Sequence, residues 1–244
     1  MVARRADSKN VGSAPRTRAR GGVRSDRSLE GSVDVKIGVI GTGNMGRTFG
    51  LLWASSGHDV LFGSRDRAKA EAVAAKHERA RAGDFDDAAA IGDVILYTVR
   101  GVLPSTLLRA PQALAGKVVI DCNNRDFDSR IDRPTPEVSL AERLAADVPQ
   151  AKIVTAFQTI PHVVAELGRD KLAPQRISVF LCSDDAAAKA TVKGLADELG
   201  FVGIDSSELK RARLLEAVGD FIRLHIGARR HGLFTSLSIQ PVQR

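Results

Sequence analysis

Residues 36–50, KIGVIGTGNMGRTFG, constrain the fold of this chain more than any other segment. A short apolar run, typical of a buried strand, leads into Gly41, Gly43 and Gly46 in GxGxxG spacing and then directly into a helical pattern. Gly41 would let the strand turn, Gly43 would let the backbone approach a pyrophosphate, and Gly46 would let the helix pack on the sheet. The free N–H groups at the helix start attract an anion. The spacing alone is weak evidence, but its place between a strand and a helix predicts a dinucleotide site.

The rest of the chain alternates between short Val/Ile/Leu-rich runs and helical patterns. The runs predict strands over residues 35–40, 59–64, 93–99, 117–122, 152–157, 177–182 and 201–205. Helices are expected over 44–56, 66–80, 104–114, 136–146, 162–167, 185–199 and 208–229. Most of the apolar runs are nearly continuous, which indicates strands covered on both faces. The alternation predicts an α/β fold with a doubly wound, mostly parallel sheet of the Rossmann type and a short C-terminal helical extension.

Positive charge is concentrated at the start of the chain. Of the net charge of +7, residues 1–31 carry +5, from eight Lys and Arg against three acidic residues, and the remaining 213 residues carry +2. With almost no large apolar residues, residues 1–33 are predicted to be a disordered basic tail, and 34–244 to form one nucleotide-binding domain. The tail could be a transit peptide, a weak tether to acidic polymers, or translated sequence ahead of the true start. It lacks the apolar stretch of a secretory signal.

Several other classes of protein find no support. The apolar runs are far shorter than the roughly 20 residues that cross a bilayer, so no membrane partner is expected. We expect a cytoplasmic location. Cys122 and Cys182 have no CxxC partner, and the five histidines never fall in HxxxH or HExxH spacing, so no disulfide framework and no metal site are predicted. Both thiols are expected to be buried and inert. Because the charge lies in the tail, no specific nucleic-acid partner is expected either.

The residues after the second predicted strand decide which dinucleotide fits. An NAD site places Asp or Glu there, whereas this chain has Gly63, Ser64 and Arg65. A hydroxyl and a guanidinium would bind the 2′-phosphate of NADP, whereas a carboxylate would repel it. Asp66 could be read as a displaced acidic residue, but the helical pattern that follows favours it as an N-cap. The sequence therefore favours NADP.

Five segments of the chain, taken in order, carry a family resemblance. The segments IGVIGTGNMG, GSRDRAKAEAVAAKH, KIVTAFQTIP, VFLCSDD and GIDSSELKRARLLEAVGDFI follow one another from residue 36 to about 224. In this order they resemble the NADPH-dependent reductases of the deazaflavin coenzyme F420. The resemblance implies direct hydride transfer between NADP(H) and a deazaflavin or flavin. That reaction depends on aligned rings more than on an acid or base side chain.

The resemblance also implies site residues, although it assigns no catalytic one. Those expected to bind the cofactor are Gly41, Thr42, Gly43, Asn44, Met45, Gly46, Ser64, Arg65, Thr98 and Val99. Those expected to face the acceptor are Arg100, Gln158, Thr159, Ile160 and Pro161.

The acceptor half departs from the family pattern. Arg100 and Gly101 stand where relatives carry a proline and an aromatic residue, and Gln158 stands where they carry His or Asn. Arg100 and Arg125 could bind an anionic acceptor or be solvated loop charges. Two alternatives therefore stay open: NADPH-dependent reduction of a small carbonyl or imine, for which His162 and Tyr97 are poor proton donors, and NADPH sensing without turnover. The C-terminal helix is expected to pack on the domain or on a second copy, which leaves a homodimer open.

Overall fold

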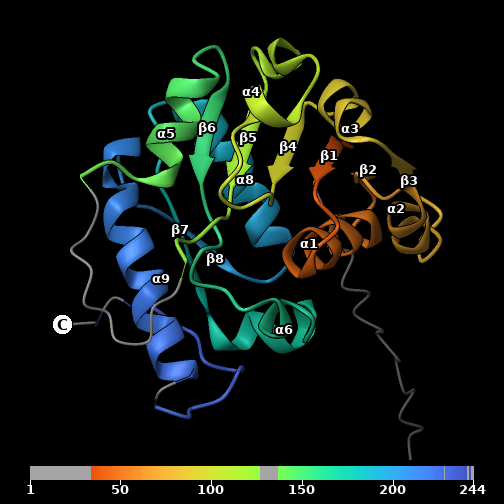
Figure 1. Ribbon diagram of the computed structural model, residues 1–244. Coiled ribbons are helices and arrows are strands. Elements are labelled where there is room, and N and C mark those ends of the chain that lie inside the picture. The colour runs from red at the N-terminus through yellow and green to blue at the C-terminus, as the bar shows by residue number, and fades with distance from the viewer. Residues whose placement is uncertain (1–33, 127–136, 228, 241, 243–244) are drawn as a thin grey trace, which may run out of the picture. The chain divides into compact units, whose positions relative to one another are not determined.

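The computed structural model describes residues 34–126, 137–227, 229–240 and 242, so the predicted basic tail lies outside the described residues. Within the described part, six parallel strands form one sheet in the order β3-β2-β1-β4-β5-β6 (Figure 1). Their bounds are β1 (Lys36–Ile40), β2 (Asp59–Gly63), β3 (Ala80–Gly83), β4 (Val94–Tyr97), β5 (Val118–Asp121) and β6 (Lys152–Thr155). The order reverses between β1 and β4, which confirms the doubly wound prediction and places a ligand crevice at their carboxyl ends.

A second, two-stranded sheet continues from this one. Strands β7 (Ser178–Leu181) and β8 (Val202–Asp205) pair in parallel. An antiparallel bridge between Thr155 and Cys182 connects the end of β6 to the end of β7. The sheet system is therefore mostly parallel, as the sequence predicts.

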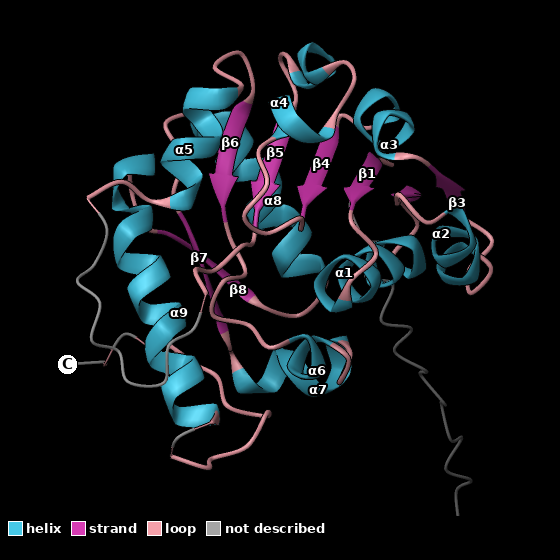
Figure 2. Ribbon diagram, in the orientation of Figure 1, coloured by secondary structure: helices cyan, strands magenta, loops and turns pink. Residues whose placement is uncertain are grey.

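Helices cover both faces of the large sheet (Figure 2). They are α1 (Asn44–Ser55), α2 (Arg67–Ala74), α3 (Phe85–Ile91), α4 (Pro104–Leu107), α5 (Leu140–Asp147), α6 (His162–Ala165), α7 (Arg169–Leu172), α8 (Ala186–Glu198) and α9 (Ala212–Ile226), with 3₁₀ turns η1 (Pro111–Leu114), η2 (Ala173–Gln175) and η3 (Leu209–Arg211). One apolar cluster joins the sheet to α1 and α8, where Trp53 Nε1 donates to the carbonyl of Leu195 at 3.1 Å. A second cluster, with Phe85 and Leu144, lies beneath α3 and α5.

The sequence prediction was wrong between residues 75 and 92. Helix α2 ends at Ala74, and the segment that follows contains strand β3 and helix α3, neither of which was predicted. Strand β3 reads ARAG and lies at the sheet edge, where a continuous apolar run is not needed. Helix α3 begins with a capping box, in which the side chains of Asp84 and Asp87 each accept from the other's backbone N–H.

The helix predicted over residues 104–114 is also wrong. It divides into the one-turn helix α4 and the 3₁₀ turn η1. Pro111 has no backbone N–H to donate, and it disfavours helical backbone at the preceding residue, Ala110, so a continuous helix cannot form there.

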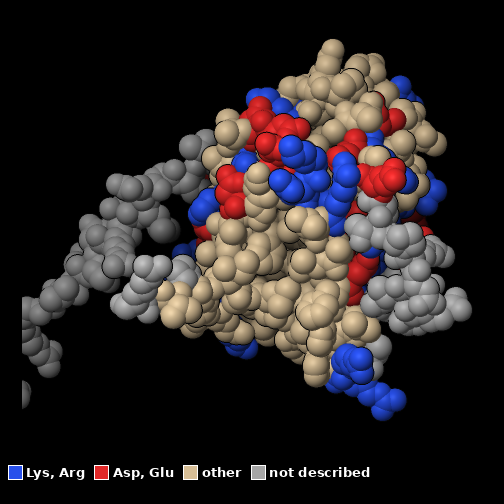
Figure 3. Space-filling view, turned by 90° about the vertical axis from the view of Figure 1, so that its left-hand side faces the viewer, with Lys and Arg blue, Asp and Glu red and all other residues tan. Residues whose placement is uncertain are grey.

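Helix α9 packs on the domain, as expected. The guanidinium of Arg213 binds Glu142 of α5 through two bonds, of 2.9 and 2.7 Å, and lowers the pKa of Glu142 to about 2. Further along α9, Asp220 pairs with Arg125 from the loop after β5. Basic and acidic side chains gather on this side of the molecule over the upper part of the view in Figure 3. Among the helices of the described residues, none is long and apolar enough to cross a bilayer.

Candidate nucleotide and acceptor site

The turn between β1 and α1 requires glycine at two positions. Gly41 has a φ of +110°, and a Cβ there would lie 2.4 Å from Thr98 Oγ1. The Thr98 hydroxyl in turn donates to the carbonyls of Ile40 and Gly41, at 3.0 and 3.2 Å. A Cβ at Gly46 would lie only 2.0 Å from the carbonyl oxygen of Gly41. These close approaches hold the first turn of α1 directly beyond the end of β1.

The start of α1 is open to an anion. Its N-cap, Gly43, has no side chain to accept from the first-turn N–H groups, and no acidic residue stands in that turn. A Cβ added at Gly43 would meet no atom within 4 Å, so the space in front of it is open. Gly43 and Asn44 are exposed, whereas Thr42 and Met45 are half-buried. Free N–H groups, the helix dipole and an unobstructed approach together fit a pyrophosphate.

The residues after β2 fit a second phosphate. The guanidinium of Arg65 is exposed, and in the part of the chain that the structure describes no carboxylate pairs with it. Its neighbour Arg67, by contrast, is bound to Glu71 at 2.9 Å.

The ambiguity over Asp66 is resolved in favour of the cap. Asp66 Oδ1 accepts from the backbone N–H of Lys69 at 3.2 Å, and these Lys69 contacts lower the pKa of Asp66. The hydroxyl of Ser64 accepts from the N–H of Asp66 at 3.1 Å. The carboxylate beside Ser64 and Arg65 is therefore engaged in starting α2.

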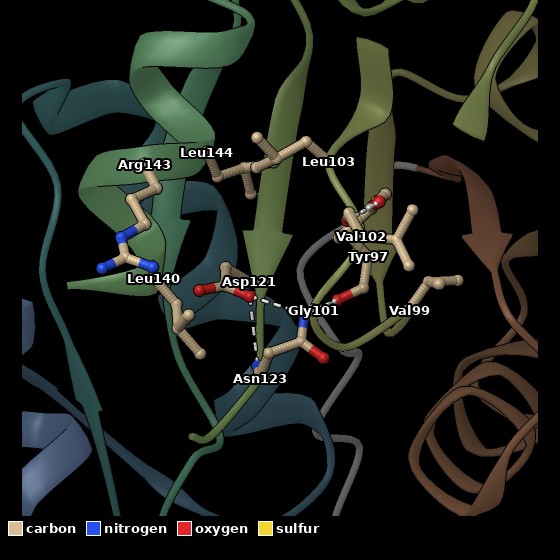
Figure 4. Close-up of a pocket in the computed structure, with 10 residues that line it drawn as sticks. All are labelled: Tyr97, Val99, Gly101, Val102, Leu103, Asp121, Asn123, Leu140, Arg143 and Leu144. Atoms are coloured by element: carbon tan, nitrogen blue, oxygen red, sulfur yellow. Dashed lines mark hydrogen bonds between the residues drawn. The ribbon is translucent and has the colours of Figure 1, made fainter. Parts of the chain in front are cut away.

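A pocket of about 180 Å³ opens at the carboxyl ends of β4 and β5, beneath α5 (Figure 4). It is lined by Tyr97, Val99, Gly101, Val102, Leu103, Asp121, Asn123, Leu140, Arg143 and Leu144. Of the predicted site residues, only Val99 lines it. The Tyr97 hydroxyl is occupied, since it donates to the carbonyl of Val102 at 2.5 Å, and burial raises its pKa. Tyr97 is therefore a poor proton donor, as the sequence suggested.

Sequence reasoning missed Asp121, the last residue of β5. Its side chain is 2% exposed, and its Oδ1 accepts from the backbone N–H and the Nδ2 of Asn123, at 3.1 and 2.8 Å. Its Oδ2 has no partner among the described residues, and burial raises the pKa of Asp121 to about 6. The sequence does contain a signal for Asp121: it is a carboxylate at the end of an apolar strand, beside the point where the strand order reverses.

The residues predicted to face the acceptor differ in their exposure, and several of them are buried. Gln158 is buried, and its Nε2 donates to the carbonyl of Asp121 at 2.9 Å and to Thr155 Oγ1. Thr159 and Ile160 are buried as well, whereas Pro161 and His162 are half-buried at the start of α6.

The two arginines of this half differ. Arg100 is exposed and lies 3.4 Å from Asp126. Arg125 has only 20% of its side chain exposed and pairs with Asp220 of α9, so its interpretation as a solvated loop charge is wrong. Asn124 connects the two loops of this half, since its Nδ2 donates to the carbonyl of Gln158 at 2.8 Å.

Cys122 and Cys182 are both buried and free, as predicted, and burial raises the pKa of each thiol. Within the described ranges, no group of His, Cys, Asp and Glu side chains could hold a metal ion.

The fold and the open turn define a nucleotide-binding oxidoreductase domain, and comparison with known proteins narrows the class. Residues 36–125 match the family described as NADP oxidoreductase, coenzyme F420-dependent. The F420-dependent NADP reductase of Methanocaldococcus jannaschii is 31% identical over 208 residues, which cover 75% of this chain and 89% of that protein. The chain therefore belongs to the family of F420-dependent NADP oxidoreductases. It is an NADP-dependent oxidoreductase, and NADP(H) is its cofactor.

Two further relatives extend the comparison. The crystal structure of a candidate F420-dependent NADP reductase from Arthrobacter sp. FB24 superposes with a TM-score of 0.71 at 28% identity, covering 85% of this chain and 100% of that one. Metalloreductase STEAP3 of Rattus norvegicus is 29% identical over 184 residues, and the match covers 36% of its length.

Proposed function

We propose that this protein transfers a hydride between NADP(H) and a deazaflavin, coenzyme F420, or a flavin. One observation carries the proposal: the open start of α1, the exposed Arg65 and the pocket beneath α5 follow β1, β2 and β4, which are neighbours in the sheet. A dinucleotide bound along this edge would have its phosphates at α1 and its nicotinamide toward β4. Bound NADPH supplies the hydride.

The geometry of the turns supports the assignment of the cofactor half. Ser64 and Arg65 would bind the 2′-phosphate through charge-assisted hydrogen bonds. Thr42, Gly43, Asn44 and Met45 would contact the pyrophosphate and the nicotinamide side, with Thr98 and Val99 beside them. Gly41 and Gly46 act indirectly, since they let the turn approach the cofactor so closely.

The acceptor half is assigned to the loops after β4 and β6. Arg100, Gln158, Thr159, Ile160 and Pro161 would border the acceptor. The bond from Asn124 to the carbonyl of Gln158 supports this assignment, because it ties the loop after β6 to the loop after β5 beside the pocket. No side chain of these loops needs to act as an acid for a ring-to-ring hydride transfer.

A second candidate is the reduction of a small carbonyl or imine with the same cofactor. One observation favours it: the buried carboxyl of Asp121 in the pocket could supply the proton that such a reduction consumes.

An acceptor screen tests the proposal. The full chain is mixed anaerobically with NADPH and then with F420, FMN, or a panel of carbonyls and imines, while the nicotinamide absorbance is followed. Oxidation by F420 or FMN supports the proposal, and oxidation by a carbonyl or imine alone supports the second candidate. Binding of NADPH without oxidation by any of them would refute both and leave a sensing role.

Association and location remain predictions. A homodimer is compatible with α9, which leaves Leu214 and Phe221 60% and 50% exposed, and sedimentation of the full chain would test it. The absence of a specific nucleic-acid partner and the cytoplasmic location are likewise expectations from the sequence.

A further inference from the structure

Two buried acidic side chains lie at the pocket and behind its wall, and they come from distant parts of the chain. Asp121 ends β5, and Glu216 lies on α9, with both side chains 2% exposed. Glu216 Oε1 accepts from the backbone N–H of Leu140 at 2.6 Å. Leu140 and Asp121 both line the pocket. Leu140 therefore lies between Glu216 and the pocket that Asp121 borders.

The surroundings favour a proton on this pair. Burial, and then the charge of Asp121, raises the pKa of Glu216 to about 7. The other ionisable groups that interact with the two acids or line the pocket are Tyr97 on β4, Cys122 directly after β5, Arg125 in the loop after β5, and Arg143 on α5. Arg125 is itself paired with Asp220, and Arg143 is exposed. Because the pKa of Glu216 lies above that of Asp121, Glu216 takes up a proton first as the pH falls, and Asp121 takes up a proton second.

Hydrogen bonding decides which oxygen of Asp121 carries that proton. Both donors of Asn123 are directed at Oδ1, as the dashed lines in Figure 4 show, whereas Oδ2 is turned toward Leu140. An oxygen that accepts two hydrogen bonds is the more stable place for the negative charge. A proton on Asp121 therefore sits on Oδ2, the oxygen with no partner among the described residues.

The size and walls of the pocket limit what it can hold. Its volume, about 180 Å³, is close to the engineered cavity of about 150 Å³ that binds benzene. Val99, Val102, Leu103 and Leu144 provide apolar walls. The pocket therefore suits a single planar ring, or one ring of a larger fused system, that presents a hydrogen-bond-accepting atom to Asp121.

We propose that Asp121, backed by Glu216, is the acid of this site: it holds a proton on Oδ2 and donates it to a nitrogen or oxygen of the ring bound in the pocket. This inference rests on the proposed function. When the acceptor carbon takes the hydride, the electron pair of its double bond moves to the conjugated heteroatom. That atom then takes the proton from Oδ2, which leaves the Asp121 carboxylate. Glu216 or solvent restores the proton.

The first test needs neither cofactor nor acceptor. The side-chain carboxyl resonances of the full chain, labelled with ¹³C at Asp and Glu, are titrated by NMR, with Asp121→Asn and Glu216→Gln identifying the two signals. We expect Asp121 to titrate near pH 6 and Glu216 near pH 7. In Asp121→Asn, Glu216 should titrate at a lower pH, because a neighbouring negative charge is removed. A midpoint for Asp121 in its ordinary range of about 4 would overturn the proposal, whatever the acceptor.

The second test separates this proposal from the proposed function. Single-turnover oxidation of NADPH by the accepted substrate is followed against pH in the wild type, Asp121→Asn, Glu216→Gln and the exposed control Asp170→Asn. We expect the wild-type rate to fall as pH rises through the Asp121 midpoint. The rate of Asp121→Asn should fall on the order of 100-fold and lose this pH dependence, with unchanged NADPH affinity and with Asp170→Asn behaving as wild type.

The outcomes are distinguishable. An active wild type whose pH profile is shared by Asp121→Asn overturns the proposed acid and leaves the proposed function standing. A wild type that no acceptor oxidises refutes the proposed function and the proton donation with it. Should Asp121→Asn fail to fold, the wild type decides, since a single-turnover rate that does not fall through the Asp121 midpoint measured by NMR would overturn the proposed acid.

Discussion

Replacing Arg65 with alanine should separate the two nicotinamide cofactors. The guanidinium is exposed, and in the described structure no carboxylate pairs with it. Its removal therefore leaves no buried group without a partner, and the loss of nucleotide affinity measures its contact with the nucleotide. A charge-assisted hydrogen bond contributes about 1.5–3 kcal/mol, which corresponds to roughly 10- to 150-fold in the dissociation constant. We expect the affinity for NADPH to fall by that factor. The affinity for NADH, which lacks the 2′-phosphate, should change less than about twofold.

Arg67→Ala is the matched control for this measurement. It removes the same charge two residues away, but from an arginine already bound to Glu71 at 2.9 Å. It should change the affinity for both cofactors only slightly. Both dissociation constants are measured by titration of the nucleotide fluorescence at low and high salt, because screening should reduce the Arg65 effect. Equal losses for NADPH and NADH in Arg65→Ala, or equal effects of the two substitutions, would refute the phosphate pocket.

Three further substitutions test other parts of the argument. Gly46→Ala puts a Cβ 2.0 Å from a backbone oxygen; it should destabilise the fold by about 1–3 kcal/mol and weaken NADPH, and an unchanged melting temperature would contradict the close packing. Gly219→Ala puts a Cβ 2.3 Å from Asn124 Oδ1, so acceptor turnover should fall several-fold while NADPH affinity is kept. Glu142→Gln removes an acid whose folded pKa, about 2, lies below its unfolded value; the variant should melt below wild type at pH 6, and the gap should close as pH falls from about 4.5 toward 2.

Local chemistry explains what the sequence could predict. The turn at Gly41 and Gly46 and the cap at Asp66 depend on residues within a few positions of one another, so their spacing in the chain already fixes their geometry. The buried strands of the sheet are continuous apolar runs because helices cover both faces. The turns and strands that border the proposed cofactor site are built from these elements, so their positions in the fold could be predicted, whereas the assignment of each residue to the cofactor stays a prediction.

Edge elements and proline positions explain the errors in the fold. Strand β3 pairs with only one neighbour, so small and polar residues suffice there and leave no apolar signal. Helix α3 is seven residues long, too short for a clear helical period, although its capping box at Asp84 and Asp87 could have indicated it. Pro111 stands inside the region predicted as one helix, and a proline at that position interrupts a helix.

The second buried acid, Glu216, could not be predicted as part of the site because the C-terminal helix brings it there from a distant part of the chain. Glu216 approaches the pocket only because α9 is fixed by Arg213 at one end and by the pair of Asp220 with Arg125 further along. These contacts join residues that are 71 and 95 positions apart, and no local pattern announces them. Since the charge of Asp121 contributes to the raised pKa of Glu216, α9 adds an acidic group to the site, and the ion pairs of α9 fix the position of that group. Breaking the Arg213–Glu142 pair should then alter the pH dependence of hydride transfer without touching the cofactor half.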